Sequence, residues 1–153
     1  MCSSDLVAIA ALDPVGNQTE NSDRARRAID RSPRTGWSTE IYKPGVIEQK
    51  AGVGLQLTLA TPARVRRVEI RSAPIGATVR IYAVRGEAPA RAPRDWAVAS
   101  AAVELRRARA VVPVQRVAPA TALLVWIVGL PAVRGGYAVR IDDIRVIGVP
   151  TGA

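Results

Sequence analysis

Residues 54–59 read Gly-Leu-Gln-Leu-Thr-Leu, a stretch in which every second side chain is leucine. Successive side chains of a strand point to opposite faces, so this period of two predicts a half-buried β-strand. The same alternation recurs at 68–71 and 79–82, and turns are expected between these segments at 61–62 and 74–76, where proline interrupts the pattern. The chain therefore has the sequence pattern of an all-β protein.

Two stretches nearer the C-terminus depart from simple alternation. Residues 123–128 are apolar at every position, which indicates a strand that is covered on both faces. Alternate positions in 137–141 are apolar, but the pattern continues at 144–146 one position out of phase. One extra residue in a strand changes the phase in this way, so we predict a β-bulge at Asp142 or Asp143.

The length and the segment boundaries indicate one domain. A chain of 153 residues suits a single domain with its own core. We predict an all-β jelly-roll sandwich of about eight antiparallel strands at 6–149, with one short N-terminal helix at 24–29. Residues 1–5 are expected to be disordered or left by truncation of a longer protein, and 150–153 to form a tail. No run of about 18 apolar residues is present, so no membrane span is expected within the chain.

The composition limits the chemistry of the chain. It contains no histidine and a single cysteine, Cys2, so His-based triads, histidine or cysteine metal sites and an intrachain disulfide are excluded. Any metal would be held by oxygen atoms, which points to calcium or magnesium. No phosphate-cradling glycine loop is present. We therefore expect a protein that is not an enzyme.

The net charge of +9 comes almost entirely from arginine, because Lys43 and Lys50 are the only lysines. One interpretation is a surface for an anionic polymer. The other is an arginine- and alanine-rich composition of the kind that a GC-rich genome encodes. The arginines are scattered and alternate with apolar residues in the predicted strands, as they do on solvated faces. We expect no specific recognition of nucleic acid.

Residues 28–39 read Ala-Ile-Asp-Arg-Ser-Pro-Arg-Thr-Gly-Trp-Ser-Thr, which resembles the early signature of discoidin (F5/8 type C, galactose-binding-like) domains. That signature is Ala-x-Asp-Gly, a few residues, and then Thr-x-Trp. The stretch 54–70 is similar to the next two strands of the family, and 141–148 to its last strand. The resemblance implies a jelly-roll binding module. Arg31 stands where the family pattern has glycine, and without histidine or phenylalanine the usual galactose site does not carry over.

A narrower resemblance covers 13–21 and 124–131. These stretches are similar to the C-terminal extracytoplasmic domain of actinobacterial MviN-type lipid II flippase proteins. This implies a non-catalytic binding or scaffolding module in the cell envelope, membrane-tethered in the full-length protein and linked to peptidoglycan synthesis. A glycan, a peptidoglycan precursor or an envelope protein would be its partner. Similar sandwiches end some membrane-bound kinases, so a purely structural or protein-interaction role is the alternative, and a polyanion binder is a third.

Loops at the rim of a sandwich are the expected ligand site, because the strand faces are used for the core. An aromatic ring offers a surface for a sugar, and a cation offers donors to carboxylate or phosphate. Three predicted loops pair an aromatic residue with a cation: Tyr42 with Lys43, Trp96 with Arg94, and Tyr137 with Arg134. The alternative is that Tyr42 and Tyr137 cover the edge of the core.

The three tryptophans have different expected positions. Trp37 lies within the discoidin-like signature and is expected to fill the core, although it could instead stack on a sugar. Trp126 lies within an apolar strand and is also expected in the core. Trp96 ends a Pro-rich stretch, so both an exposed and a buried position are open.

A calcium site is implied by the discoidin resemblance, since in several relatives the loop before the tryptophan meets the last strand around a calcium ion. The corresponding residues are Asp30, Thr35 and Asp143, with Asp142 as the other acidic candidate. Calcium takes six to eight oxygen ligands, several of them backbone carbonyls. The alternative is that Asp30 caps a turn and that Asp143 pairs with an arginine.

Overall fold

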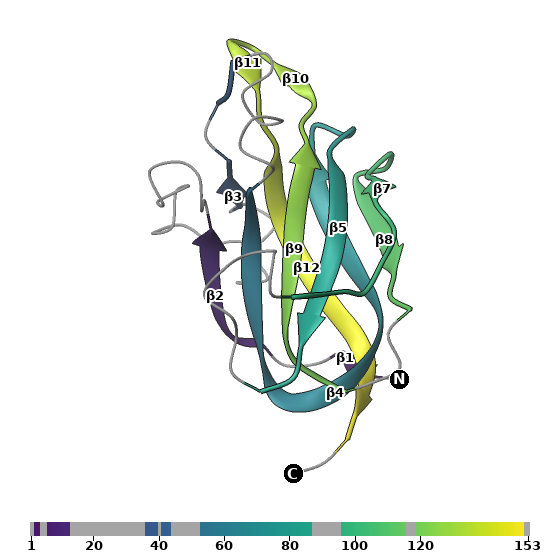
Figure 1. The fold of residues 1–153 in the computed structure, drawn as a ribbon. Helices are drawn as coiled ribbons and strands as arrows, with labels where there is room; N and C mark the ends of the chain where they lie inside the picture. Colours follow the sequence, from purple (N-terminus) through teal and green to yellow (C-terminus); the bar gives the residue numbers. More distant parts are fainter. Residues whose placement is uncertain are drawn as a thin grey trace.

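The computed structural model describes residues 2–3, 6–12, 36–39, 41–43, 53–86, 96–115 and 119–151. All secondary structure in these ranges is β, and every strand pair is antiparallel, which confirms the all-β prediction (Figure 1). No helix in this part of the chain is long and apolar enough to cross a membrane. The predicted helix at 24–29 and the Pro-rich stretch at 87–95 lie outside the described residues.

Ten strands belong to one curled sheet, and two form a separate hairpin. In chain order the strands are β1 (Cys2–Ser3), β2 (Leu6–Leu12), β3 (Trp37–Ser38), β4 (Val53–Ala73), β5 (Thr78–Val84), β6 (Ala97–Val98), β7 (Val103–Glu104), β8 (Arg109–Pro113), β9 (Ala120–Gly129), β10 (Ala132–Val133), β11 (Gly136–Tyr137) and β12 (Arg140–Pro150). The hairpin consists of β10 and β11. Strand β1, which consists of residues 2–3, pairs with β12.

The longest strand, β4, curls the sheet into two layers. Its first part pairs with β2 and β9, and its second part pairs with β12 and β8. The chain does change direction at 61–62, where a turn was predicted, but it does so as a bend within one continuous strand that passes from one layer to the other. The pairing with β9 shifts register between Thr58 and Ala63, and the Pro62 carbonyl accepts a hydrogen bond of 2.9 Å from the Thr151 amide. Proline, which cannot donate to a ladder, is accommodated at such a bend.

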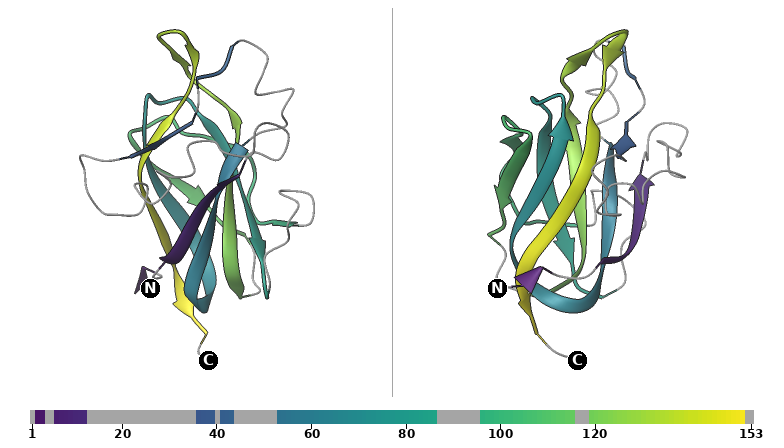
Figure 2. Two further views of the ribbon diagram at one scale, coloured as in Figure 1. Left: turned by 90° about the vertical axis from the view of Figure 1, so that its left-hand side faces the viewer. Right: turned by 180° about the vertical axis from the view of Figure 1, so that it is seen from behind.

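The two layers face each other across the core. One contains β2, the first part of β4, β9 and β5, with short β6 and β7 at the edge of β5. The other contains β12, the second part of β4, and β8. Figure 2 shows these layers from the side and from behind, with the two termini at the same end of the sandwich.

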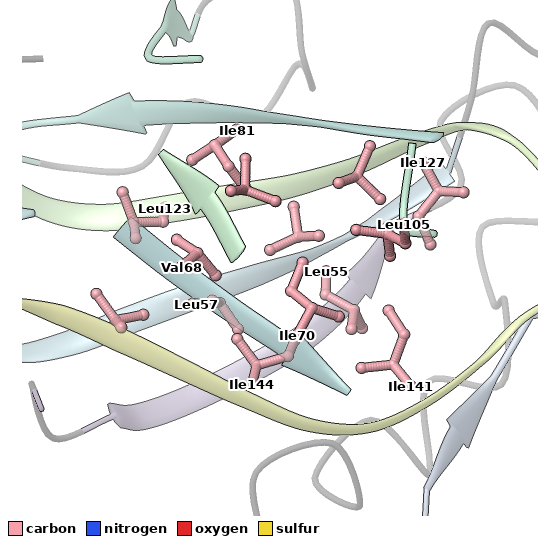
Figure 3. Close-up of a cluster of buried hydrophobic side chains, with 14 of the residues drawn as sticks. Leu55, Leu57, Val68, Ile70, Ile81, Leu105, Leu123, Ile127, Ile141 and Ile144 are labelled. Carbon is pink, nitrogen blue, oxygen red and sulfur yellow. The ribbon is translucent and has the colours of Figure 1, made fainter. Parts of the chain in front are cut away.

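The alternating apolar side chains fill the space between the layers. Leu55 and Leu57 point inward from one layer, and Val68 and Ile70 from the other; all four are fully buried (Figure 3). Trp37 is also fully buried in this cluster, as predicted. Full burial of each leucine, isoleucine or valine side chain in this cluster contributes roughly 1.5–3 kcal/mol to the stability of the fold.

A second, smaller cluster covers the opposite face of β9. It contains Trp96, Ala122, Leu124 and Trp126. The prediction that residues 123–128 are covered on both faces is therefore confirmed for 123–127, whereas Val128 is exposed. Trp96 is only 5% exposed, so of its two expected positions the buried one is observed. Trp96 directly precedes β6, and the pairing of β6 with the end of β5 brings the Trp96 indole against β9.

The predicted β-bulge is present in β12. Ile141 pairs with Ser72 and Asp143 pairs with Arg71, so Asp142 is the extra residue. Beyond the bulge, Ile144 returns to the core. The bulge also turns the Asp142 side chain into the protein, where it is buried.

Candidate functional site

The β10–β11 hairpin lies at the end of the sandwich opposite the two termini (Figure 1). An open groove of about 830 Å³ lies beside it. Three segments form it: the chain after β3, the turn between β4 and β5, and the hairpin with the start of β12. The lining residues are Ser38, Thr39, Ile41, Ala73, Pro74, Val133, Arg134, Ala138, Val139 and Arg140. Apolar side chains make up most of this lining.

Backbone hydrogen bonds connect two walls of the groove that are distant in sequence. The Thr39 amide donates to the Val139 carbonyl at 3.0 Å, and the Val139 amide donates to the Thr39 hydroxyl at 3.2 Å. Tyr42 and Tyr137 exchange two backbone hydrogen bonds of 2.8 Å each. Two of the three predicted loops, those containing Tyr42 and Tyr137, are thereby brought together.

Gly136 allows the close approach of these walls. Its φ is 153°, and a Cβ atom at this position would overlap the Tyr42 carbonyl. The neighbouring Gly135 has a φ of 92° but open space around it. Gly135 therefore allows the backbone conformation of the hairpin turn, whereas Gly136 allows the hairpin to pack closely against residues 41–42.

The aromatic residues predicted for the ligand site do not line the groove. Tyr42 is 5% exposed and belongs to the core, and Tyr137 is half-buried. Lys43 is exposed next to this bridge. Of the third predicted pair, Trp96 lies in the cluster on the outer face of β9, and Arg94 lies outside the described residues. Of the five candidates that the structure describes, Arg134 alone lies in the groove wall.

Arg140 is a groove residue that the sequence analysis did not single out. Its Nε lies 2.6 Å from Asp142 Oδ1, and its Nη2 donates to Oδ2 at 3.4 Å. The Arg140 side chain is 53% exposed, whereas that of Asp142 is 8% exposed. Oδ1 is close enough for an ion pair, but no hydrogen bond with normal angles reaches it. It lies against Gly36, where a Cβ atom would overlap it. The sequence signal for the buried position of Asp142 was the phase change that predicted the β-bulge.

The residues predicted for calcium are only partly described. Asp30 and Thr35 lie outside the described residues. Asp143 Oδ2 accepts a hydrogen bond of 3.0 Å from Arg145 Nε, which is the alternative considered for this residue. Both aspartates of the bulge therefore have an arginine partner. Among the described residues, no group of three or more acidic or cysteine side chains could hold a metal ion.

The arginines on the outer face of the β12–β4–β8 layer alternate with carboxylates. Arg67 pairs with Glu69 at 2.9 Å, and Arg109 Nη1 lies 3.8 Å from the same carboxylate. On β12, the strand beside β4, Arg145 pairs with Asp143. A face of mixed charge does not present a continuous basic surface to a polyanion. This arrangement favours the interpretation of these arginines as a solvated face.

No protein-family model matches the chain. Solved structures match over almost its whole length. A pectin-binding carbohydrate-binding module has a TM-score of 0.65 at 13% identity, covering 98% of this chain and 96% of that one. The CBM32 of AlyQ, in complex with 4,5-unsaturated mannuronic acid, has a TM-score of 0.63 at 13% identity, with coverage of 96% and 98%.

Chitosan-binding module 1 from a chitosanase/glucanase of Paenibacillus sp. IK-5 has a TM-score of 0.65 at 16% identity, covering 92% of this chain and 94% of that one. The chain also matches a part of larger enzymes: it spans 25% of a Ruminococcus gnavus GH29 fucosidase, with a TM-score of 0.63 at 14% identity. At these identities the likeness concerns the fold. The chain thus has the galactose-binding-like β-sandwich fold that is found in carbohydrate-binding modules of the CBM32 type.

Proposed function

We propose that the chain is a non-catalytic glycan-binding module and that its ligand lies in the groove beside the β10–β11 hairpin. The observation that carries this proposal is the match, over nearly the full length of both chains, to modules that bind carbohydrate. The groove supports it, because ligand sites are concave and mostly apolar with a few polar groups. Ile41, Pro74 and Val133 offer apolar surface to a sugar ring, and Arg134 adds a polar group to the lining.

We further propose that the module acts outside the cytoplasm, tethered to the membrane in its full-length protein and facing the cell wall. The resemblance of 13–21 and 124–131 to the extracytoplasmic domain of MviN-type flippases supports this location. A peptidoglycan precursor or fragment is then the expected glycan. The fold leaves the ligand chemistry open, since the similar modules include one that binds pectin and one that binds chitosan.

Backbone amide chemical shifts, recorded while soluble peptidoglycan fragments and neutral galactosides are added, test the groove as the ligand site. We expect shifts at Ser38, Thr39 and Ile41 and at 133–140 at millimolar fragment. Ala73→Trp places an indole in the groove wall and is expected to abolish them, because Ala73 lines the groove.

Ala97→Trp is the matched control. Ala97 is exposed on β6 and does not belong to the groove lining, so binding by this variant should equal that of the parent chain. If no saccharide shifts the groove amides of the parent chain, the glycan-binding proposal fails, and a spacer or protein-contact role replaces it.

A further inference from the structure

Among the residues that the structure describes, two charged side chains line the groove, and both are arginines, Arg134 and Arg140. No carboxylate is among the lining residues that the structure describes. Asp142, two positions after Arg140 on the same strand, is buried and is paired with Arg140. A ligand in the groove therefore meets guanidinium groups and apolar surface.

Arg134 leaves its donors available to a ligand. It lies at the exposed turn of the β10–β11 hairpin, and in the described part of the chain no ion pair involves it. A guanidinium presents five N–H donors in a planar fork that matches the oxygen atoms of a carboxylate or phosphate.

Arg140 is positioned for the same task. Asp142 forms an ion pair with its Nε and accepts one hydrogen bond from Nη2, and among the described residues Nη1 and the second Nη2 hydrogen have no other partner. The carboxylate that orients it is buried in the bulge against Gly36, where its movement is restricted. A guanidinium that is already oriented loses less conformational entropy when a ligand binds.

We propose that the groove selects an acidic saccharide, whose oxyanion binds Arg134 and Arg140 while its ring lies against Ile41 and Pro74. Asp142 acts as a positioning residue that holds Arg140 at the groove wall. This inference rests on the proposed glycan-binding function and adds the class of ligand. The shared chemistry is an oxyanion on a sugar ring, as a carboxylate or as a phosphate.

Isothermal titration with trigalacturonate, its methyl ester and mannose 6-phosphate tests the inference. We expect the acid to bind at least about tenfold more tightly than the ester, which corresponds to about 1.4 kcal/mol. Arg134→Gln and Arg140→Gln should each remove most of this preference. The phosphate identifies the source of the oxyanion: binding of the phosphate without the acid would replace uronate by sugar phosphate as the ligand class.

Asp142→Asn and Asp143→Asn are a matched pair, because both aspartates pair with an arginine but only Arg140 lines the groove. Loss of Arg140 positioning lowers the affinity for the acid and leaves that for the ester unchanged. We expect this from Asp142→Asn and no change from Asp143→Asn. An equal loss for acid and ester would instead show a purely structural role for Asp142.

The outcomes separate this inference from the function on which it rests. If acid and ester bind equally well in the groove, the module binds glycans but does not select acidic ones. If neither the acid, the ester nor any other saccharide shifts the groove amides, the glycan-binding proposal itself fails. Should Asp142→Asn not fold, Arg134→Gln, at an exposed turn, still decides the selectivity.

Discussion

Tyr42 and Tyr137 lie in an isolated β-bridge and exchange backbone hydrogen bonds of 2.8 Å in both directions. This bridge joins the chain after β3 to the hairpin that precedes β12, and both of these segments contribute lining residues to the candidate groove. The shape of the groove therefore depends on a contact between two segments that are far apart in the sequence.

Gly136→Ala is expected to weaken this contact. The substitution introduces a Cβ atom that overlaps the Tyr42 carbonyl, and it also strains a positive φ. A residue held in such a conformation costs of order 1–3 kcal/mol, and the overlap adds to it. Gly135→Ala has the same kind of φ strain without the overlap. Urea denaturation should therefore show a larger loss for Gly136→Ala; equal losses would contradict the close-approach argument.

Leu57→Ala is expected to lower the free energy of unfolding by about 2–5 kcal/mol, because it opens a cavity in the core. Leu57 is fully buried between the two layers. Val111→Ala is the control, since Val111 is 49% exposed on β8, and a change below about 1 kcal/mol is expected there. Thermal and urea unfolding measure both, and a loss below about 1 kcal/mol for Leu57→Ala would contradict the described core.

Tryptophan emission should be blue-shifted and poorly quenched by iodide. Trp37, Trp96 and Trp126 are all at most 5% exposed, and none of them lines the groove. Saccharide binding in the groove is therefore expected to change the emission little, while unfolding should shift it strongly to the red. Efficient quenching of the folded protein would show that at least one of the indoles is exposed.

Calcium is expected to leave the melting temperature unchanged. Asp142 and Asp143 are already paired with Arg140 and Arg145, and a guanidinium beside a carboxylate repels a divalent cation. Differential scanning calorimetry in chelator and in millimolar calcium measures the effect. A stabilisation approaching about 2.7 kcal/mol at a hundredfold excess over the dissociation constant would instead support the site predicted at Asp30, Thr35 and Asp143.

Local pattern was sufficient for several features of the fold. The leucines at 55 and 57 alternate with polar residues, and they point into the core because a strand has a period of two. The phase change after Ile141 predicted a bulge at Asp142 or Asp143, because an inserted residue shifts that period, and the structure has it at Asp142. The continuous apolar stretch around Trp126 likewise predicted a strand that is covered on both faces.

Tertiary structure decided the features that depend on which segments meet. The bend in β4 near Pro62 has the local signals of a turn, and only pairing with β9 on one side and β12 on the other makes it one continuous strand. Trp96 has no periodic context, and its burial follows from the pairing of β6 with β5.

The site divides in the same way. The aromatic and cationic side chains that are available follow from the amino-acid sequence alone, which also made Arg134 a candidate. Only the fold placed Tyr42 in the core and Arg140 in the groove wall, with buried Asp142 beside it. The physical reason is that a local pattern specifies the face of a strand to which a side chain points, whereas a groove is formed by segments whose proximity results from long-range pairing.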